Sequence, residues 1–424
     1  VPDRLVYSAK SWLCHSNVDR RAPILPWGAG AQITKISPVA TTAAYLKHIR
    51  LAWNAAWGPE EDRHLENQIV VLTVPASFDE VARELTLEAA KTAGINAAIL
   101  LEEPLAAFYS WVMRHEKNWR EFVQPGELIL VCDIGGGTTD FTLILLKDAD
   151  GSPRFERIAV GDHLILGGDN IDLALAHQVE SRLAGKRRAM STDSWKALCH
   201  QCRQGKEAIL SGSAAAFTVT LMGEGGRLIA DTQRVELTEA LIAQTVLDGF
   251  FPIAADKPLP AAGERKGITE FGLPYELEPA ITRHMKGFID KHADEVESTL
   301  QRGSARPDLI LYNGGSLKPT VVRQRIRTAL QQWYHETDSD GLRVLESHDL
   351  DLAVAFGAAY YGLVKIGKGV RVGSGSPRSY YLGVARNENG LTEDASREVM
   401  CIVERGLEEG SPIDLADKSF EAVS

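Results

Sequence analysis

The sequence predicts an α/β fold that is divided into several domains. With 424 residues the chain is too long for one hydrophobic core, and its length corresponds to about two to four domains. Short apolar runs alternate with segments of helical periodicity, as in layered α/β proteins. Several apolar runs end in turns with consecutive glycines, and such turns suit the binding of phosphate groups.

The composition is that of a soluble globular protein and argues against several function classes. The chain is 44% hydrophobic and 24% charged, and its net charge of −11 argues against general binding of nucleic acids or anionic membranes. No apolar run approaches the ~20 residues of a membrane helix, and no signal peptide opens the chain. Five cysteines do not make a disulfide scaffold, so we expect a cytoplasmic protein. The first residue is Val1 rather than methionine, and one interpretation is that the chain is a fragment.

A βαβ layer is predicted in the first quarter of the chain. Residues 38–57 place aromatic and aliphatic side chains at helical spacing, which indicates an amphipathic helix whose aromatic residues lie in the core. Residues 58–68 are polar and read as a loop, and residues 69–74 form a buried strand. Ser77 and Glu80 have the spacing of a capping box for the next helix, which ends near a glycine. A second strand and an EEP turn into another helix follow.

The segment VCDIGGGTTD, residues 131–140, is predicted to be a phosphate-binding hairpin. Apolar runs on both sides indicate two buried strands, and three glycines allow a positive φ and leave the backbone amides uncovered. Asp133 ends the first strand, where it suits a magnesium ion held through water, and Thr138 places a hydroxyl beside the amides. The alternative is a glycine-rich hairpin without a ligand.

Two further glycine turns stand before helices. GGDNID at 167–172 suits a hinge or a close approach to phosphate. DLILYN followed by GGS is a buried strand with a turn, and Pro319 is expected at the first helical position, so this turn is a second candidate cradle for phosphate or ribose phosphate. In the segment 349–362, alanine and glycine on one helix face predict close packing against the sheet.

The remaining segments carry weaker signals. Cys199 and Cys202 form one C-x-x-C pair without a second pair, so we do not expect a zinc site, which needs about four ligands. Residues 252–275 are rich in proline and glycine and read as an insertion that contacts a partner or braces the ligand. Residues 366–378 read as a linker, and residues 379–424 contain short alternating strands.

These motifs carry a family resemblance. DIGGGTTD between two buried strands resembles the second phosphate loop of the actin-like ATPase superfamily, most closely that of the seventy-kilodalton heat-shock chaperones of the DnaK type. From about Ser8 to Gly362, AK, VPASF, EEPLAA, GGDNID, NGGS and AVAFGAA stand in the family's order. The resemblance implies an actin-like fold with two lobes around a nucleotide cleft. It implies a first lobe at 1–125, a second lobe at 126–365 with an upper half-lobe at about 169–296, and the start of a β-sandwich substrate-binding domain at 379–424.

The resemblance also implies ATP or ADP with Mg²⁺ as cofactors and assigns roles to residues. Pro75 matches the proline tied to signalling between the lobes, and Asp133 would hold Mg²⁺ through water. The alternative interpretation of Lys10 is a surface lysine, and that of Glu103 and Asp351 is a charge at a helix N-terminus. The implied catalytic residues are Lys10, Glu103, Asp133 and Thr138. The implied nucleotide-binding residues are Gly135, Gly136, Gly137, Thr138, Thr139, Gly167, Gly168, Lys206, Gly314, Gly315, Ser316, Lys318 and Asp351.

The sequence departs from the family in three places. Arg203 stands where the family has a ribose-binding glutamate, Glu207 where it has a residue that stacks on adenine, and Lys318 near the position of an arginine. The family's first phosphate loop, an acidic GTT hairpin near the N-terminus, does not occur in this sequence. The leading hypothesis is a DnaK-like ATPase core that controls the binding of client polypeptides and works with co-chaperones. The alternatives are a non-hydrolysing scaffold of the same fold that binds partners through 252–275, and a small-molecule kinase of the superfamily.

Overall fold

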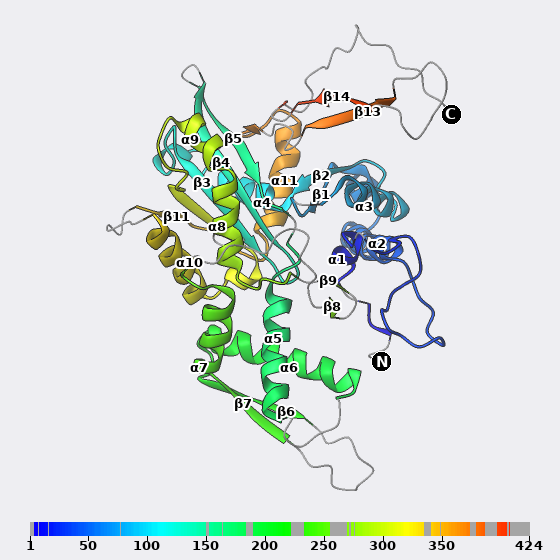
Figure 1. Cartoon of the computed structure of the whole chain (residues 1–424). Helices are drawn as coiled ribbons and strands as arrows, with labels where there is room; N and C mark the ends of the chain where they lie inside the picture. Colours follow the sequence, from blue (N-terminus) through cyan, green and yellow to red (C-terminus); the bar gives the residue numbers. More distant parts are fainter. Residues whose placement is uncertain are drawn as a thin grey trace.

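The structure is a computed structural model (Figure 1). It describes residues 4–6, 8–15, 17–76, 78–149, 152–162, 164–183, 190–221, 233–254, 269–270, 273–274, 276–334, 341–347, 349–373, 379–385, 397–404 and 407.

The predicted βαβ layer is present in the first part of the chain. Strands β1 (Val70–Val74) and β2 (Ala98–Glu102) run parallel, and α3 (Glu80–Thr92) connects them. Asp79 caps α3, because its side chain accepts a hydrogen bond from the backbone N–H of Ala82. The predicted capping residue Ser77 lies outside the described residues. Helices α1 (Ala9–Leu13) and α2 (Pro38–Trp57) pack beside α3, and α4 (Glu103–Arg114) follows β2 directly.

The aromatic residues of α2 lie on the surface, so their prediction as core residues was wrong. Only the N-terminal part of α2 is buried, and Tyr45 and Trp53 are 47% and 43% exposed. Both side chains satisfy their polar atoms locally: the Tyr45 hydroxyl donates to the carbonyl of Val6, and the Trp53 indole donates to the carbonyl of Arg63. The rest of α2 therefore projects beyond the core that its periodicity indicated.

A sheet of six strands dominates the second part of the chain. Its order is β11-β10-β3-β4-β5-β12. The strands are β3 (Leu128–Ile134), β4 (Thr139–Ala149), β5 (Ser152–Val160), β10 (Leu309–Asn313), β11 (Arg343–Leu345) and β12 (Val372–Gly373). Successive residues of β3 point to opposite faces, and both faces are buried. One set packs under α8 (Ile281–Lys291) and α10 (Thr320–Trp333), and the other packs under α4 and α11 (Ala353–Lys365).

A smaller unit extends from one end of this sheet (Figure 1). It contains α5 (Gly168–Leu183), α6 (Thr192–Leu210), β6 (Ala216–Leu221), β7 (Gln233–Thr238) and α7 (Glu239–Ile242), which continues as a π-helix over Ala243–Phe250. Helix α9 (Ala293–Leu300) follows α8 beside the main sheet. Of the expected insertion 252–275, the structure describes residues 252–254 and the short strands β8 (Thr269–Glu270) and β9 (Leu273–Pro274). The proposed role of the insertion stays a prediction.

Helix α11 crosses α4 at very short range. A Cβ atom at Gly357 would lie 1.7 Å from the carbonyl oxygen of Ala106, so only glycine fits at this crossing. The small residues thus provide close packing as predicted, but mainly against α4 rather than directly against the sheet.

Three charged residues, two of them with buried side chains, join the first part of the chain to the large sheet. Glu102 at the end of β2 forms an ion pair with Arg83 of α3 at 3.0 Å and a second ion pair with Arg157 of β5. The side chains of Glu102 and Arg157 are 9% and 6% exposed. Burial, and next the neighbouring Arg83, lower the pKa of Arg157 to about 10.

The C-terminal segment differs in part from the predicted linker and tail. Within 366–378, Val372–Gly373 forms β12 and pairs with β5, so this part is an edge strand of the sheet rather than a free linker. Strands β13 (Tyr380–Ala385) and β14 (Arg397–Val403) pair in antiparallel fashion, as the alternating patterns predicted. The predicted strand near residue 419 lies outside the described residues. In the part of the chain described, no helix combines the length and apolarity needed to cross a membrane.

Candidate nucleotide site

The glycine hairpin between β3 and β4 is held in place by backbone hydrogen bonds. The N–H of Gly135 donates to the carbonyl of Thr138 at 2.9 Å. The carbonyl of Gly135 accepts from the N–H of Gly168 at 3.0 Å and from the Ser316 hydroxyl at 2.8 Å. The three predicted glycine turns therefore meet at one place, although they lie far apart in the sequence.

The glycines of this hairpin provide space rather than an unusual backbone conformation. None of Gly135, Gly136 and Gly137 has a positive φ, so that part of the prediction was wrong. A Cβ atom on Gly137 would lie 3.1 Å from the Ser11 hydroxyl, and one on Gly136 would lie 3.4 Å from the Asp169 carboxylate. Any larger residue would fill the concavity above the amides.

The other two glycine turns approach the hairpin at backbone contact distance. A Cβ atom on Gly167 would lie 2.6 Å from the carbonyl oxygen of Gly136. Gly314 has φ +92°, and a Cβ atom there would lie 2.3 Å from the carbonyl oxygen of Ile134 and 2.9 Å from a carboxylate oxygen of Asp133. Glycine is thus required at both positions by the close approach of the strands.

Three carboxylates gather beside the hairpin. Asp133 at the end of β3 stands opposite Asp140 at the start of β4, and both are nearly fully buried. Burial raises the pKa of Asp133 to about 7, with further contributions from Glu103 and Asp140. Lys10 and a hydrogen bond from Asn313 oppose this shift.

Lys10 supplies the positive charge of this cluster. Its ammonium group donates to both carboxylate oxygens of Glu103, at 2.8 and 2.7 Å. Burial lowers the pKa of Lys10, but Glu103, Asp140 and Asp133 together outweigh it and raise the pKa above its ordinary value. Although 45% of the Lys10 side chain is exposed, the ammonium group faces three acids. The structure thus places Lys10, Glu103 and Asp133, to which the family resemblance assigns one site, close together, and their roles stay a prediction.

The two threonines of the hairpin are placed differently. Thr139 is fully buried, and its hydroxyl donates to the carbonyl of Leu166 at 2.8 Å, which leaves it turned away from a ligand above the glycines. Thr138 is 6% exposed and closes the glycine turn through its carbonyl. Thr139 therefore contributes to the site by fixing the hairpin.

A cavity of about 770 Å³ opens beside the glycine turns. On one wall, the buried Lys206 of α6 pairs with Asp172 at 2.7 Å and donates to the carbonyl of Gly168 at 3.1 Å. Burial raises the pKa of Asp172 to about 6, although Lys206 opposes the shift. The predicted residues Gly136, Gly168, Lys206, Gly315, Ser316, Lys318 and Asp351 all line this cavity.

Two exposed ion pairs border the same cavity. Arg203 and Glu207 pair at 3.0 Å on α6, and Lys318 pairs with Asp351 at 2.6 Å across the mouth. Helix α6 thus presents opposite charges on successive turns to a ligand in the cavity.

A comparison with protein families gives a match over the middle of the chain. A family model described as "Hsp70 protein" matches residues 32–247, which is just over half of the chain. The chain belongs to the Hsp70 family. This membership and the α/β structure confirm the predicted family and its actin-like ATPase fold.

Curated Hsp70-type relatives match at about one third identity. "Chaperone protein HscA" of Enterobacter sp. (strain 638) is 32% identical over 252 residues, which are 58% of this chain and 38% of the relative. "Chaperone protein HscA homolog" of Variovorax paradoxus (strain S110) is 30% identical over 308 residues, 66% of this chain and 46% of the relative. The homolog of Colwellia psychrerythraea is 33% identical over 186 residues, 44% of this chain and 27% of the relative. The matched region spans less than half the length of these relatives.

The structure adds residues that sequence reasoning did not single out. Asp140, Ser11, Asp169, Asp172 and Asn313 all lie beside the glycine turns or the carboxylates. Each stands within or directly beside a motif that the sequence analysis used. Their position next to the motif glycines or to Lys10 could have pointed to these residues. The pairing of strands that brings them together in space is not visible in a linear sequence.

The residues fit a nucleotide with a hydrated magnesium ion. The concavity above Gly136 and Gly137 is one that a Cβ atom would fill, and the buried Oδ1 of Asn313 has no hydrogen-bond partner in the described part of the chain. Across the described residues, no group of three or more His, Cys, Asp and Glu side chains is arranged to hold a metal directly. The buried Asp133 and Asp140 at the turn offer carboxylate oxygens, the ligand type that Mg²⁺ takes through its water molecules.

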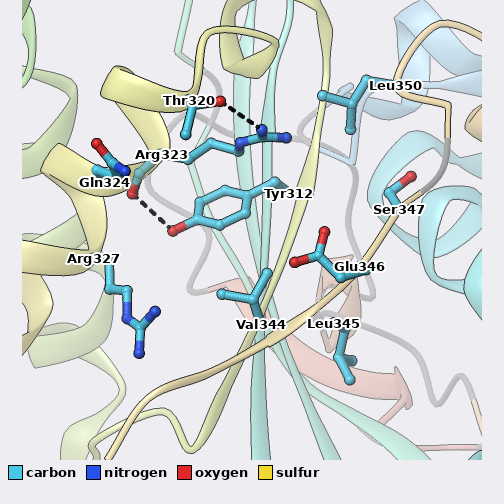
Figure 2. A pocket seen from close by; sticks show the side chains of 10 residues that line it. All are labelled: Tyr312, Thr320, Arg323, Gln324, Arg327, Val344, Leu345, Glu346, Ser347 and Leu350. Carbon is cyan, nitrogen blue, oxygen red and sulfur yellow. Dashed lines mark hydrogen bonds between the residues drawn. The ribbon is translucent and has the colours of Figure 1, made fainter. Parts of the chain in front are cut away.

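A second, smaller cavity of about 150 Å³ lies between α10 and the ends of β10 and β11 (Figure 2). The Tyr312 hydroxyl donates to the carbonyl of Arg323, and the Arg323 guanidinium donates to the Thr320 hydroxyl. The Tyr312 bond holds α10 against β10, and the Arg323 bond lies within α10 (Figure 2). Val322 of α10 lines the larger cavity. None of the predicted site residues lines the smaller cavity.

Proposed function

We propose that this chain is the ATP-binding and ATP-hydrolysing core of an Hsp70-type chaperone, in which nucleotide state controls the binding of client polypeptides. The observation that carries the proposal is the convergence of the glycine hairpin 135–137 with Lys10, Glu103 and Asp133. Backbone amides beside a set of acids around one lysine suit phosphoryl transfer, which depends on positioning and charge stabilisation.

In this proposal each group has a defined task. The amides of residues 135–138 hold the phosphates, and Asp133 holds Mg²⁺ through water so that the cation neutralises phosphate charge. Glu103 accepts a hydrogen bond from the attacking water, and Lys10 stabilises the negative charge that develops on the transferred phosphate. The salt bridge between Lys10 and Glu103 keeps both groups in position.

The large cavity is proposed to take the nucleoside. Lys206 and Gly168 would border the ribose, and Lys318 with Asp351 would close over the base. The opposite charges of Arg203 and Glu207 replace the groups that the family resemblance implies, so recognition of adenine would depend more on the GGS turn and the shape of the cavity.

The domain assignment is also part of the proposal. Residues 1–125 and 126–365 would be the two lobes, with the upper half-lobe at about 169–296, and the strands after residue 379 would begin the client-binding domain. All three relatives above carry the word chaperone in their names, which supports client polypeptides and co-chaperones as partners. Among the described residues no cysteine takes part in a disulfide bond, which supports a cytoplasmic location.

A non-hydrolysing scaffold of the same fold is the second candidate. The observation that favours it is that Arg203 and Glu207 stand where the family resemblance implies a ribose-binding glutamate and a residue that stacks on adenine. A small-molecule kinase is less favoured, because no acceptor site with a catalytic carboxylate is evident in the sequence.

Titration calorimetry with Mg-ADP and Mg-ATP, combined with phosphate release, tests the proposal. Gly137→Val would fill the concavity above the amides and should abolish binding, whereas Gly303→Ala, at an open position, should bind as wild type does. Binding with turnover would support the ATPase. Binding without turnover would favour the scaffold, and a chain that binds neither nucleotide would refute the nucleotide site.

A further inference from the structure

Asn313 occupies an unusual place at the end of β10. The strand before it is apolar and fully buried, and Asn313 itself is only 2% exposed. It stands directly opposite Asp133 in the parallel pairing of β10 with β3. Its side chain lies close enough to the Asp133 carboxylate to oppose the rise in the pKa of that group.

The other end of this amide has no partner. The Asn313 Oδ1 atom is buried and accepts no hydrogen bond within the described part of the chain. A buried oxygen without a partner destabilises the fold, and an apolar side chain at this position would avoid that cost. The polar side chain is therefore better explained by a partner that binds at this place.

The surroundings indicate the chemistry of that partner. Gly314, the next residue, has φ +92° and leaves a carboxylate oxygen of Asp133 in the space that a Cβ atom would take. Asp140 stands on the other side of Asp133 in the sheet. An acceptor oxygen among carboxylates repels phosphate oxygens, but it suits a water molecule whose protons are made acidic by a bound cation.

We propose that Asn313 is a positioning residue for a hydrated divalent cation. Its N–H orients Asp133, and its Oδ1 accepts a hydrogen bond from a water molecule bound to the cation. The inference rests on the proposed nucleotide function, since it assigns a second group to the same cation. In this inference the neutral Asn313 on β10 acts on the hydrated cation together with the acidic Asp133 on β3.

Thr142 supplies a matched control in the same sheet. It is 1% exposed, and its hydroxyl also lacks a partner in the described part of the chain. Its cross-strand neighbours are Val131 and Val160 rather than acids. Removal of the Thr142 hydroxyl therefore tests the general effect of a buried polar atom without touching the carboxylates.

The experiment is calorimetric titration of ADP in saturating Mg²⁺ and in chelator, on wild type, Asn313→Leu, Asn313→Asp and Thr142→Val. The readout is the ratio of the two dissociation constants, which measures how far Mg²⁺ strengthens binding. We expect Asn313→Leu to reduce this ratio about tenfold with little change in chelator, as for other groups that orient metal ligands. Asn313→Asp keeps an acceptor oxygen and should recover most of the ratio, and Thr142→Val should match wild type.

The results separate the inference about Asn313 from the proposed nucleotide function. An unchanged ratio in Asn313→Leu would overturn the inference and leave the nucleotide site intact. Thermal unfolding without nucleotide shows whether Asn313→Leu folds. If it does not fold, Asn313→Asp becomes the test. A folded Asn313→Asp whose ratio of dissociation constants is far below that of wild type would also overturn the inference. Wild type that binds no ADP in either condition would instead refute the proposed function on which the inference rests.

Discussion

The ammonium nitrogen of Lys10 lies 2.8 and 2.7 Å from the two carboxylate oxygens of Glu103, although 93 positions separate the residues in the sequence. Lys10 belongs to the short helix α1, and Glu103 is the first residue of α4. This pair fixes a positive charge among the acids around Asp133, and it links the earliest part of the chain to the end of β2.

Replacing Lys10 tests its role in hydrolysis. Lys10→Met keeps the length of the side chain but removes the charge, so we expect single-turnover hydrolysis of ATP to fall by about 100-fold. Binding of ADP, measured by calorimetry, should change much less, because the amides of the hairpin are untouched. Lys35→Met, at an exposed position, is the control. Equal hydrolysis rates in the two variants would contradict the assigned role.

The buried Asp172 predicts a pH dependence of stability. Its pKa is about 6 in the folded chain against an ordinary value of 3.8, so the folded state holds a proton that the unfolded state has already lost. The stability from this group is complete below about pH 4 and is lost as the pH rises through 6, by at most about 3 kcal/mol. Between these pH values, the free energy of unfolding measured in urea should fall less with rising pH in Asp172→Asn than in wild type. The same slope in both proteins would argue against this assignment.

The buried ion-pair contact at Glu102 predicts a large loss of stability when its charge is removed. Glu102→Gln leaves Arg83 and Arg157 close together without their shared carboxylate, which should cost about 3–5 kcal/mol. Glu88→Gln is the matched control, because its ion pair with Arg21 is exposed, and it should change stability by less than about 0.5 kcal/mol. Denaturant unfolding of both variants gives the comparison, and similar values would show that the buried contact contributes little.

Exchanging the two charged residues Arg203 and Glu207 on α6 is expected to increase the affinity for nucleotide. In Arg203→Glu with Glu207→Arg the ion pair keeps its spacing, with the acid now nearer the helix N-terminus, which is the more favourable orientation. A carboxylate would then meet the ribose and a guanidinium the base, so ADP should bind about five- to tenfold tighter by calorimetry. Arg182→Glu, on α5 outside the cavity, should leave the affinity unchanged. Weaker binding by the reversed pair would contradict the proposed orientation of the nucleoside.

Local patterns predicted the strands and the glycine turns, and the family resemblance implied a common site for Lys10, Glu103 and Asp133. Long-range pairing explains what was missed. Asp140 belongs to the quoted hairpin and Asn313 precedes a quoted turn, but only the register of β3 with β4 and β10 places both against Asp133. The aromatic residues of α2 show the opposite case, because helical periodicity alone does not say how far along a helix the core extends.

The close fit of Gly167 against the glycine hairpin also means that α5 and the hairpin move together as a rigid unit. The N–H of Gly168, the first residue of α5, donates to the carbonyl of Gly135, and the N–H of Asp169 donates to that of Gly136. There is no side chain between the two backbones that could deform and absorb a displacement. A rotation of the unit built on α5 and α6 would therefore displace the hairpin amides, and a force applied far from the hairpin would alter how tightly the proposed site holds phosphate.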